Sequence, residues 1–189
     1  EDWPGNNSIP PYMRPADERS KDFELVNQGY LGYMGLGLSF REVEMLVWLE
    51  VLRDKQCDDR PCEIGMPVMD GGENKGGCPV KIHIPEVLHL MGEGKFRQAF
   101  ELIKDSNPLP NVTGRVCPQE SQCEVRCTLG RRHEPVAIGR LERYVADWEL
   151  GDGVTPPEAP KPTGKRVAVI GCGPAGLTCA ADLARMGHH

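Results

Sequence analysis

The 189-residue sequence lacks a long apolar run, an excess of basic residues and any Cys-x2-Cys pair. No stretch reaches the roughly 18 apolar residues of a transmembrane helix. The formal net charge of −6 argues against a nucleic-acid binder, because such proteins carry a basic patch or stripe. The N-terminus is polar and proline-rich, with no apolar stretch to act as a secretory signal. We therefore expect a cytoplasmic protein that has neither nucleic acid nor a membrane as a partner.

Cysteine is present in a pattern. Eight cysteines in 189 residues are too few for a disulfide-stabilised scaffold, and intracellular thiols stay reduced unless they bind metal or do redox chemistry. Six of them form two groups of three, Cys57, Cys62 and Cys78, then Cys117, Cys123 and Cys127. Zinc sites use cysteine pairs two to four residues apart, whereas a proline after the cysteine is typical of iron–sulfur ligands. Proline follows Cys78 and Cys117, which favours iron–sulfur clusters, with zinc and free thiols as alternatives.

Apolar periodicity predicts helices around these cysteines. A capping-box pattern at Ser39 and Glu42 begins a helix that should run to about Lys55. Further helices are predicted from Pro85, around residues 96–103 and over residues 136–150, with a break at residues 107–110. Two [4Fe–4S] clusters need eight ligands, and oxygen ligands are candidates for the two that the cysteines do not supply. Asp54 lies three residues before Cys57, and Glu142 lies on the last helix; the alternative for Glu142 is a solvated carboxylate paired with Arg140 or Arg143.

The chain divides by composition into four predicted parts. Residues 1–38 form an extended arm that ends in a packed, irregular, glycine-rich loop at residues 29–38, and residues 39–150 form the helical domain. Residues 151–164 hold four prolines and three glycines, which is typical of a linker. Residues 165–189 begin another domain, with a buried parallel strand at 166–170 and a helix over 177–186.

A glycine-rich loop joins that predicted strand to that helix. It follows the pattern G-x-G-x-x-G, in which the backbone and the helix N-terminus bind a pyrophosphate. The candidate cofactor-binding residues are Gly171, Gly173, Pro174, Ala175 and Gly176. The motif alone does not separate FAD from NAD. Cys172 and Cys179, in this loop and helix, are expected to be small packing residues.

Five segments in this order resemble the N-terminal domain of the NADPH-dependent glutamate synthase small subunit. The same domain occurs in ferredoxin:NADP transhydrogenase large subunits and in dihydropyrimidine dehydrogenase. The segments are Cys78-Pro79-Val80, Ile84-Pro85, residues 114–120, Gln122-Cys123-Glu124 with Cys127, and residues 135–143. The resemblance covers about residues 75–189 well and residues 22–62 more loosely.

The resemblance implies a mainly α fold class: a helical domain with two [4Fe–4S] clusters near a flavin, followed by the first β-α unit of a Rossmann-like FAD-binding domain, truncated here. The implied ligands are Cys57, Cys62 and Cys127 for one cluster, and Cys78, Cys117 and Cys123 for the other. A Gln or Glu completes the second cluster in some members, and Glu142 occupies that place. Two departures affect the first cluster, because Asp54 replaces the family's first cysteine and residues 63–77 lengthen the last gap. That cluster then has an aspartate ligand, is a [3Fe–4S] cluster with an incomplete ligand set, or is absent.

The implied activity is that of an NAD(P)H-dependent iron–sulfur flavoprotein oxidoreductase. Electrons would pass between NAD(P)H-reduced FAD and a second oxidoreductase subunit or domain, in a hetero- or homo-oligomer. No residue of this chain is expected to be an acid–base catalyst. NADP(H) would bind in the remainder of a longer protein, of which this chain is expected to be a piece that is inactive by itself. The alternatives are a structural zinc-binding interaction module and a divergent scaffold that has lost the first cluster.

Overall fold

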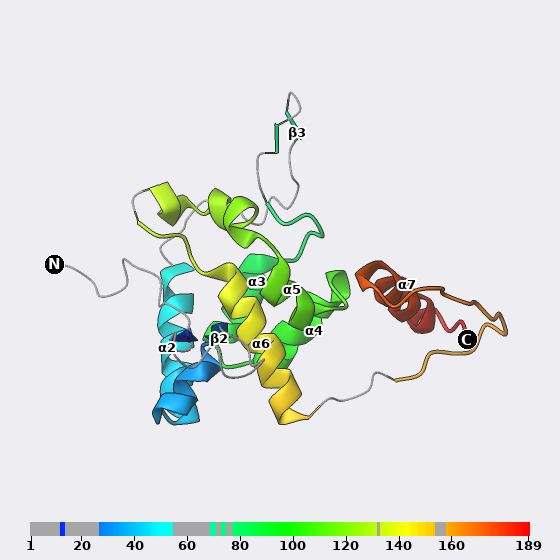
Figure 1. Cartoon of the computed structure of the whole chain (residues 1–189), viewed down its shortest axis with the longest axis horizontal. Coiled ribbons are helices and arrows are strands. Elements are labelled where there is room, and N and C mark those ends of the chain that lie inside the picture. Colours follow the sequence, from blue (N-terminus) through cyan, green and yellow to red (C-terminus); the bar gives the residue numbers. More distant parts are fainter. Residues whose placement is uncertain are drawn as a thin grey trace, which may run out of the picture. The chain divides into compact units, whose positions relative to one another are not determined.

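Helices form most of the chain that the structure describes, as the apolar periodicity predicts. The computed structural model describes residues 12–13, 27–54, 69–70, 73–74, 77–131, 133–153 and 158–189. The chain falls into two units, Glu1–Leu150 and Gly151–His189. The α-helices of the first unit are α2 (Phe40–Asp54), α3 (Ile84–Gly92), α4 (Phe96–Ser106), α5 (Pro110–Val116) and α6 (Ile138–Asp152) (Figure 1). The mainly α fold class is thereby confirmed.

The helix α2 begins with the predicted capping box. The Ser39 backbone N–H donates to Glu42 Oε2 at 2.7 Å, and the Glu42 N–H lies 3.4 Å from Ser39 Oγ. Each side chain thereby satisfies a backbone donor that the helix leaves unpaired. The helix ends at Asp54, one residue before the predicted end.

A single apolar core holds α2, α3 and α4 together. The buried residues of α2 are Val43, Val47 and Val51, four positions apart, so they lie on one face of the helix. The two helices α2 and α3 lie close together at Gly92, where an added Cβ would lie 3.3 Å from Val51 Cγ1. Ala99, Phe100 and Ile103 of α4 are buried as their spacing predicts. Each large apolar side chain buried in this way contributes about 1.5–3 kcal/mol.

The helix α5 was not predicted. Residues 107–110 do end α4, but Pro110 lies in the first turn of α5, where its missing N–H costs nothing. This helix crosses α6 closely. A Cβ on Gly114 would lie 2.9 Å from both the Cα and the N of Arg143, so a glycine is needed at the crossing.

A buried ion pair fixes α2 to the segment before α6. Glu50 and Arg53 lie 2.7 Å apart and are 0% and 2% exposed. Glu50 Oε1 also accepts from the Ala137 N–H at 2.9 Å, while Arg53 donates to the carbonyl oxygens of Pro135 and Glu134. Both charges are therefore hydrogen-bonded as well as paired, which a buried pair requires.

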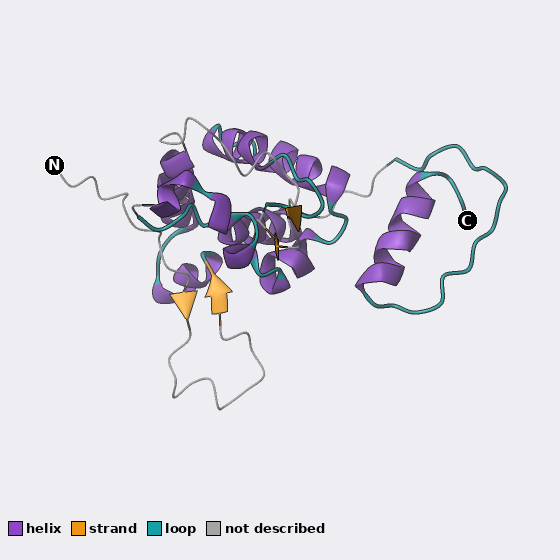
Figure 2. Ribbon diagram, turned by 90° about the horizontal axis from the view of Figure 1, so that it is seen from above, coloured by secondary structure: helices purple, strands orange, loops and turns teal. Residues whose placement is uncertain are grey.

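The glycine-rich segment at residues 29–38 departs from the prediction of an irregular loop. Leu31–Leu36 forms a 3-10 helix, η1. Tyr30 is buried beside it, which agrees with the prediction that this segment is packed. Two short antiparallel pairs are present, β1 (Tyr12–Met13) with β2 (Asn27–Gly29), and β3 (Met69–Asp70) with β4 (Glu73–Asn74), the second within residues 63–77 (Figure 2).

The second unit consists of a loop and the helix α7 (Pro174–Arg185), which confirms the predicted helix and begins it three residues earlier. Residues 166–170 contain no assigned strand, and Ile170 is 99% exposed. A parallel strand needs neighbouring strands to pair with. Within residues 158–189, a hydrogen bond joins this run to the last residue, from the Val167 N–H to the His189 carbonyl oxygen at 2.7 Å. The predicted β-α unit is therefore seen here as a helix and its preceding loop.

Among the residues described, no helix has both the length and the apolar character needed to cross a bilayer.

Candidate metal centre

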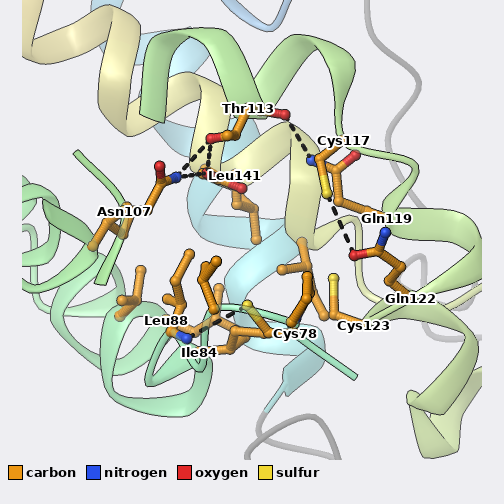
Figure 3. A pocket seen from close by; sticks show the side chains of 17 residues that line it. Cys78, Ile84, Leu88, Asn107, Thr113, Cys117, Gln119, Gln122, Cys123 and Leu141 are labelled. Atoms are coloured by element: carbon orange, nitrogen blue, oxygen red, sulfur yellow. Dashed lines mark hydrogen bonds between the residues drawn. The ribbon is translucent and has the colours of Figure 1, made fainter. Parts of the chain in front are cut away.

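Three cysteines of the predicted set, Cys78, Cys117 and Cys123, line one cavity of about 110 Å³ (Figure 3). Glu142 lines the same cavity. The other polar residues of the lining are Asn107, Thr113, Gln119 and Gln122. The apolar residues are Pro79, Val80, Ile82, Ile84, Val87, Leu88, Ile103, Ile138 and Leu141. The cavity therefore combines sulfur and oxygen donors with a largely apolar wall.

A tight turn before α3 presents Cys78. The Lys81 N–H bonds to the Cys78 carbonyl at 3.2 Å, and Lys81 has a φ of 59°, which is uncommon for a residue with a side chain. The turn brings the Ile82 N–H to 3.4 Å from Cys78 Sγ. Hydrogen bonds from the backbone to ligand sulfurs are one of the means by which proteins tune an iron–sulfur cluster.

Cys117 and Cys123 lie at the ends of a short turn after α5. The Cys117 N–H donates to the Thr113 carbonyl at 2.9 Å, which closes the last turn of the helix. Cys123 directly precedes the 3-10 helix η3 (Glu124–Arg126). The Gly77 N–H donates to the Gln122 carbonyl at 2.8 Å, so the segments that carry Cys78 and Cys123 are joined one residue away from each thiol.

Burial keeps two thiols of the cavity, Cys117 and Cys123, protonated when no metal is present. Burial, followed by the nearby Glu142 carboxylate, raises the pKa of Cys117 to about 11. Burial and the neighbouring Glu124 raise the pKa of Cys123 still further above its usual range. Thiolates are the forms that bind metal, so metal binding must release these protons.

Glu142 reaches the cavity from α6 and is hydrogen-bonded by neutral groups. Its Oε1 accepts from Asn107 Nδ2 at 2.9 Å and from Thr113 Oγ1 at 2.7 Å. The Gln119 side chain also hydrogen-bonds the carboxyl group, and burial raises the pKa of Glu142 above its ordinary value. The Arg143 side chain pairs with Asp147 instead, with 3.4 Å between Nε and Oδ2. The alternative of a solvated carboxylate paired with arginine does not hold for the described residues.

The other predicted ligands lie apart from this cavity or outside the described residues. Cys127 is buried but does not line the cavity, and its Sγ lies 3.5 Å from the Val136 N–H. Asp54 ends α2, and its side chain is not described. Cys57 and Cys62 lie outside the described residues. The ligand set of the first cluster therefore stays a prediction.

The thiol and carboxyl side chains line the cavity and do not meet at one common centre. Within the described ranges, no three His, Cys, Asp or Glu side chains are gathered so that they could hold one metal ion. A zinc ion needs its thiolates about 2.3 Å from a common centre. A cubane cluster binds each ligand at a different iron, so its ligands are farther apart. Three thiols and a carboxyl around an apolar cavity therefore fit a cluster better than a single ion.

The glycine loop of the second unit has the three features expected of its pattern. Gly171 has a φ of 106°, which turns the chain tightly, and an added Cβ on Gly176 would contact the Gly171 carbonyl oxygen. Gly173 has open space beside it, so a ligand can approach its backbone. Pro174 and Ala175 begin α7, whose N-terminus can bind an anion.

Two cysteines of this second unit differ from their prediction. Cys172 and Cys179 are exposed and do not pack. The helix α7 has no partner element within residues 158–189 against which the two side chains could be buried.

Four polar residues of the cavity were missed by the sequence analysis: Asn107, Thr113, Gln119 and Gln122. Thr113 carried a usable signal, because it lies four residues before Cys117 and so shares its helix face. That signal depends on recognising α5. Asn107 lies in a proline-rich break, where composition predicts a surface turn and not a buried side chain.

Comparisons with known proteins give a family match over more than half of the chain. Residues 44–154 match the family model of dihydropyrimidine dehydrogenase domain II, 4Fe-4S cluster. The chain is 41% identical over 154 residues to the glutamate synthase [NADPH] small chain of Escherichia coli K12, which covers 79% of this chain and 32% of that protein. Against the Azospirillum brasilense protein of the same name, identity is 39% over 180 residues, covering 94% and 32%.

A third relative has a different name. The putative oxidoreductase AegA of Escherichia coli K12 is 46% identical over 111 residues, which cover 58% of this chain and 17% of that protein. The chain therefore spans about a third or less of the length of these relatives.

Proposed function

Because this chain belongs to the 4Fe-4S family of dihydropyrimidine dehydrogenase domain II, we propose that it is the electron-transfer part of an NAD(P)H-dependent iron–sulfur flavoprotein oxidoreductase. The observation that carries the proposal is the convergence of Cys78, Cys117, Cys123 and Glu142 on one cavity. The relatives named glutamate synthase [NADPH] small chain favour NADPH as the electron source. When bound, the clusters would exchange single electrons and FAD would accept the hydride.

Two ligand sets are proposed. The cavity supplies Cys78, Cys117 and Cys123, with Glu142 as the fourth ligand of one cluster. Cys57, Cys62 and Cys127, with Asp54 in the place of a fourth cysteine, would hold the other. A carboxylate is a harder ligand than a thiolate, and it would therefore give each cluster a different potential from an all-cysteine one.

The protein groups around the cavity would control the potential of the cluster that Cys78, Cys117, Cys123 and Glu142 hold. The Ile82 N–H at Cys78 Sγ would withdraw electron density from the thiolate. The apolar wall of the cavity, formed by residues such as Leu88 and Ile103, would exclude water and lower the local dielectric constant. Both are recognised means of tuning cluster potentials.

The glycine loop is proposed to bind the pyrophosphate of FAD at the N-terminus of α7. Gly171, Gly173, Pro174, Ala175 and Gly176 are the proposed contacts, and the geometry of the loop supports them. This loop and helix would be completed into a Rossmann-like domain by strands of a longer protein. NADP(H) would bind in that remainder.

The electron acceptor is proposed to be a second oxidoreductase subunit or domain, in a hetero- or homo-oligomer in the cytoplasm. This part of the proposal rests on the family alone.

The test is the amount of iron and acid-labile sulfide per chain, after purification without oxygen. About eight of each supports two [4Fe–4S] clusters, and about four of each supports one. The variant Cys117→Ser should lose about half of the iron if there are two clusters and nearly all of it if there is one.

The matched control is Cys179→Ser, which changes an exposed cysteine on α7 and should leave the iron content unchanged. Zinc without sulfide would support the alternative of a structural zinc module and would overturn the proposal.

A further inference from the structure

The residue Asn107, between α4 and α5, has a fixed amide orientation. Asn107 is buried, with only 6% of the residue exposed. The Leu109 N–H lies 3.1 Å from Oδ1, and a backbone N–H can only donate, so Oδ1 must face it. The amide nitrogen is thereby directed to the other side, where it donates to Thr113 Oγ1 at 2.6 Å and to Glu142 Oε1 at 2.9 Å. Both hydrogens of Nδ2 are used.

The hydroxyl of Thr113 adds a second donor to the same oxygen. Thr113 Oγ1 accepts from Asn107 and has one hydrogen to donate. The nearest acceptor is Glu142 Oε1 at 2.7 Å, against 3.2 Å for the Leu109 carbonyl and 3.4 Å for the Pro110 carbonyl. Oε1 therefore receives two hydrogen bonds, one for each of its lone pairs.

The second carboxyl oxygen is left for another partner. The hydrogen bonds from Asn107 and Thr113 both end on Oε1. Neither of these two donors occupies Oε2. Asn107 and Thr113 are neutral, and Glu142 forms no ion pair within the described part of the chain, although a buried carboxylate needs a compensating positive charge. A bound iron would supply it.

We propose that Asn107 and Thr113 are positioning residues that hold Oε1 of Glu142, so that the carboxylate binds the cluster through Oε2 alone. The inference rests on the proposed function, in which Glu142 is a cluster ligand. It assigns the choice of oxygen to two side chains that bind no iron themselves, as outer-shell partners of metal ligands do elsewhere.

The test compares Thr113→Val, which removes the hydroxyl and keeps the shape, with Thr113→Ser, which keeps the hydroxyl. The chain is purified without oxygen, and iron content, the EPR spectrum of the reduced protein and the potential of each cluster are measured. In Thr113→Val the iron content should match that of the unchanged chain. The EPR signal of one cluster should change, and its potential should fall, because a carboxylate with fewer donors gives more electron density to the iron. Thr113→Ser should restore both properties.

Three further variants complete the design. Ser106→Ala removes a hydroxyl next to Asn107 that, among the described residues, is not a hydrogen-bond partner of Glu142, and this variant should match the chain without substitutions. If Thr113→Val does not fold, Thr113→Ala tests the same hydrogen bond without added bulk on a helix position. A Glu142→Ala variant shows independently whether Glu142 is a ligand.

The outcomes separate the two levels of the argument. If the chain without substitutions binds no iron and sulfide, the proposed cluster is overturned. If the Glu142→Ala variant has an unaltered spectrum, Glu142 is not a ligand of the cluster. If Glu142→Ala changes one cluster and Thr113→Val does not, the positioning inference alone is overturned. A change in Thr113→Val that Thr113→Ser fails to restore would reduce Thr113 to a packing role and would overturn the inference as well.

Discussion

Thr113 and Glu142, which lie 29 residues apart in the sequence, are joined by a hydrogen bond of 2.7 Å between Thr113 Oγ1 and Glu142 Oε1. The bond connects α5 to α6 at the wall of the cavity (Figure 3). It lies beside the close crossing at Gly114. The position of the carboxylate therefore depends on how the two helices pack.

Glu142 should destabilise the metal-free chain at neutral pH. Burial raises its pKa in the folded state above the unfolded value. The folded state then holds the proton more tightly, so stability declines as pH rises from the unfolded pKa through the folded pKa. Glu142→Gln removes the ionisation and keeps the shape.

We expect metal-free Glu142→Gln to melt at a higher temperature than the unchanged chain near pH 8, with the difference disappearing as the pH falls toward about 4.5. Thermal melts of the metal-free proteins over this range are the measurement. A difference that does not depend on pH would contradict the expectation.

Cys117 should react slowly with alkylating reagents in the metal-free chain. Its pKa is raised to about 11, chiefly by burial, so little thiolate is present at about pH 8. Iodoacetamide labelling followed by peptide mass spectrometry should show slower modification of Cys117 than of the exposed Cys172. The rate at Cys117 should climb as the pH approaches about 11. Equal rates for the two cysteines at about pH 8 would count against this prediction.

Arg53→Met should destabilise the fold strongly. It leaves the buried Glu50 carboxylate without its 2.7 Å partner, and breaking a buried pair costs about 3–5 kcal/mol of unfolding free energy. The control is Lys95→Met, which breaks an exposed pair of the same length with Glu93 and should cost about 0–1 kcal/mol. Urea unfolding of the variants measures both, and similar losses would show that burial does not set the cost.

Gly114→Ala should separate α5 from α6. The added methyl group would lie 2.9 Å from Arg143 backbone atoms, and overpacking of this kind costs about 1–3 kcal/mol. Iron content should fall too, because Thr113 and Cys117 move with α5. The control, Gly151→Ala on α6, has no atom within 4 Å and should be neutral or stabilising by up to about 1 kcal/mol. Retention of full iron and stability in Gly114→Ala would contradict the close crossing.

Local patterns were sufficient for several elements. Ser39 and Glu42 predicted the start of α2, and the spacing of Ala99, Phe100 and Ile103 predicted the buried face of α4. Each of these signals acts within one helical turn, where geometry follows from the backbone alone. The predicted strand at 166–170 was not confirmed, because a strand depends on partner strands elsewhere in the chain and not on local geometry alone.

The sequence by itself determined the donor types and their order, namely six cysteines before the linker and a glycine loop after it, and these were enough to identify the family. Only the tertiary structure decided which donors meet. Cys78, Cys117 and Glu142 come from three segments that converge on one cavity, and Asn107 joins them from a break that looked like a surface turn. The physical reason is that spacing governs contacts within an element, whereas contacts between elements depend on how closely helices pack, as at Gly114.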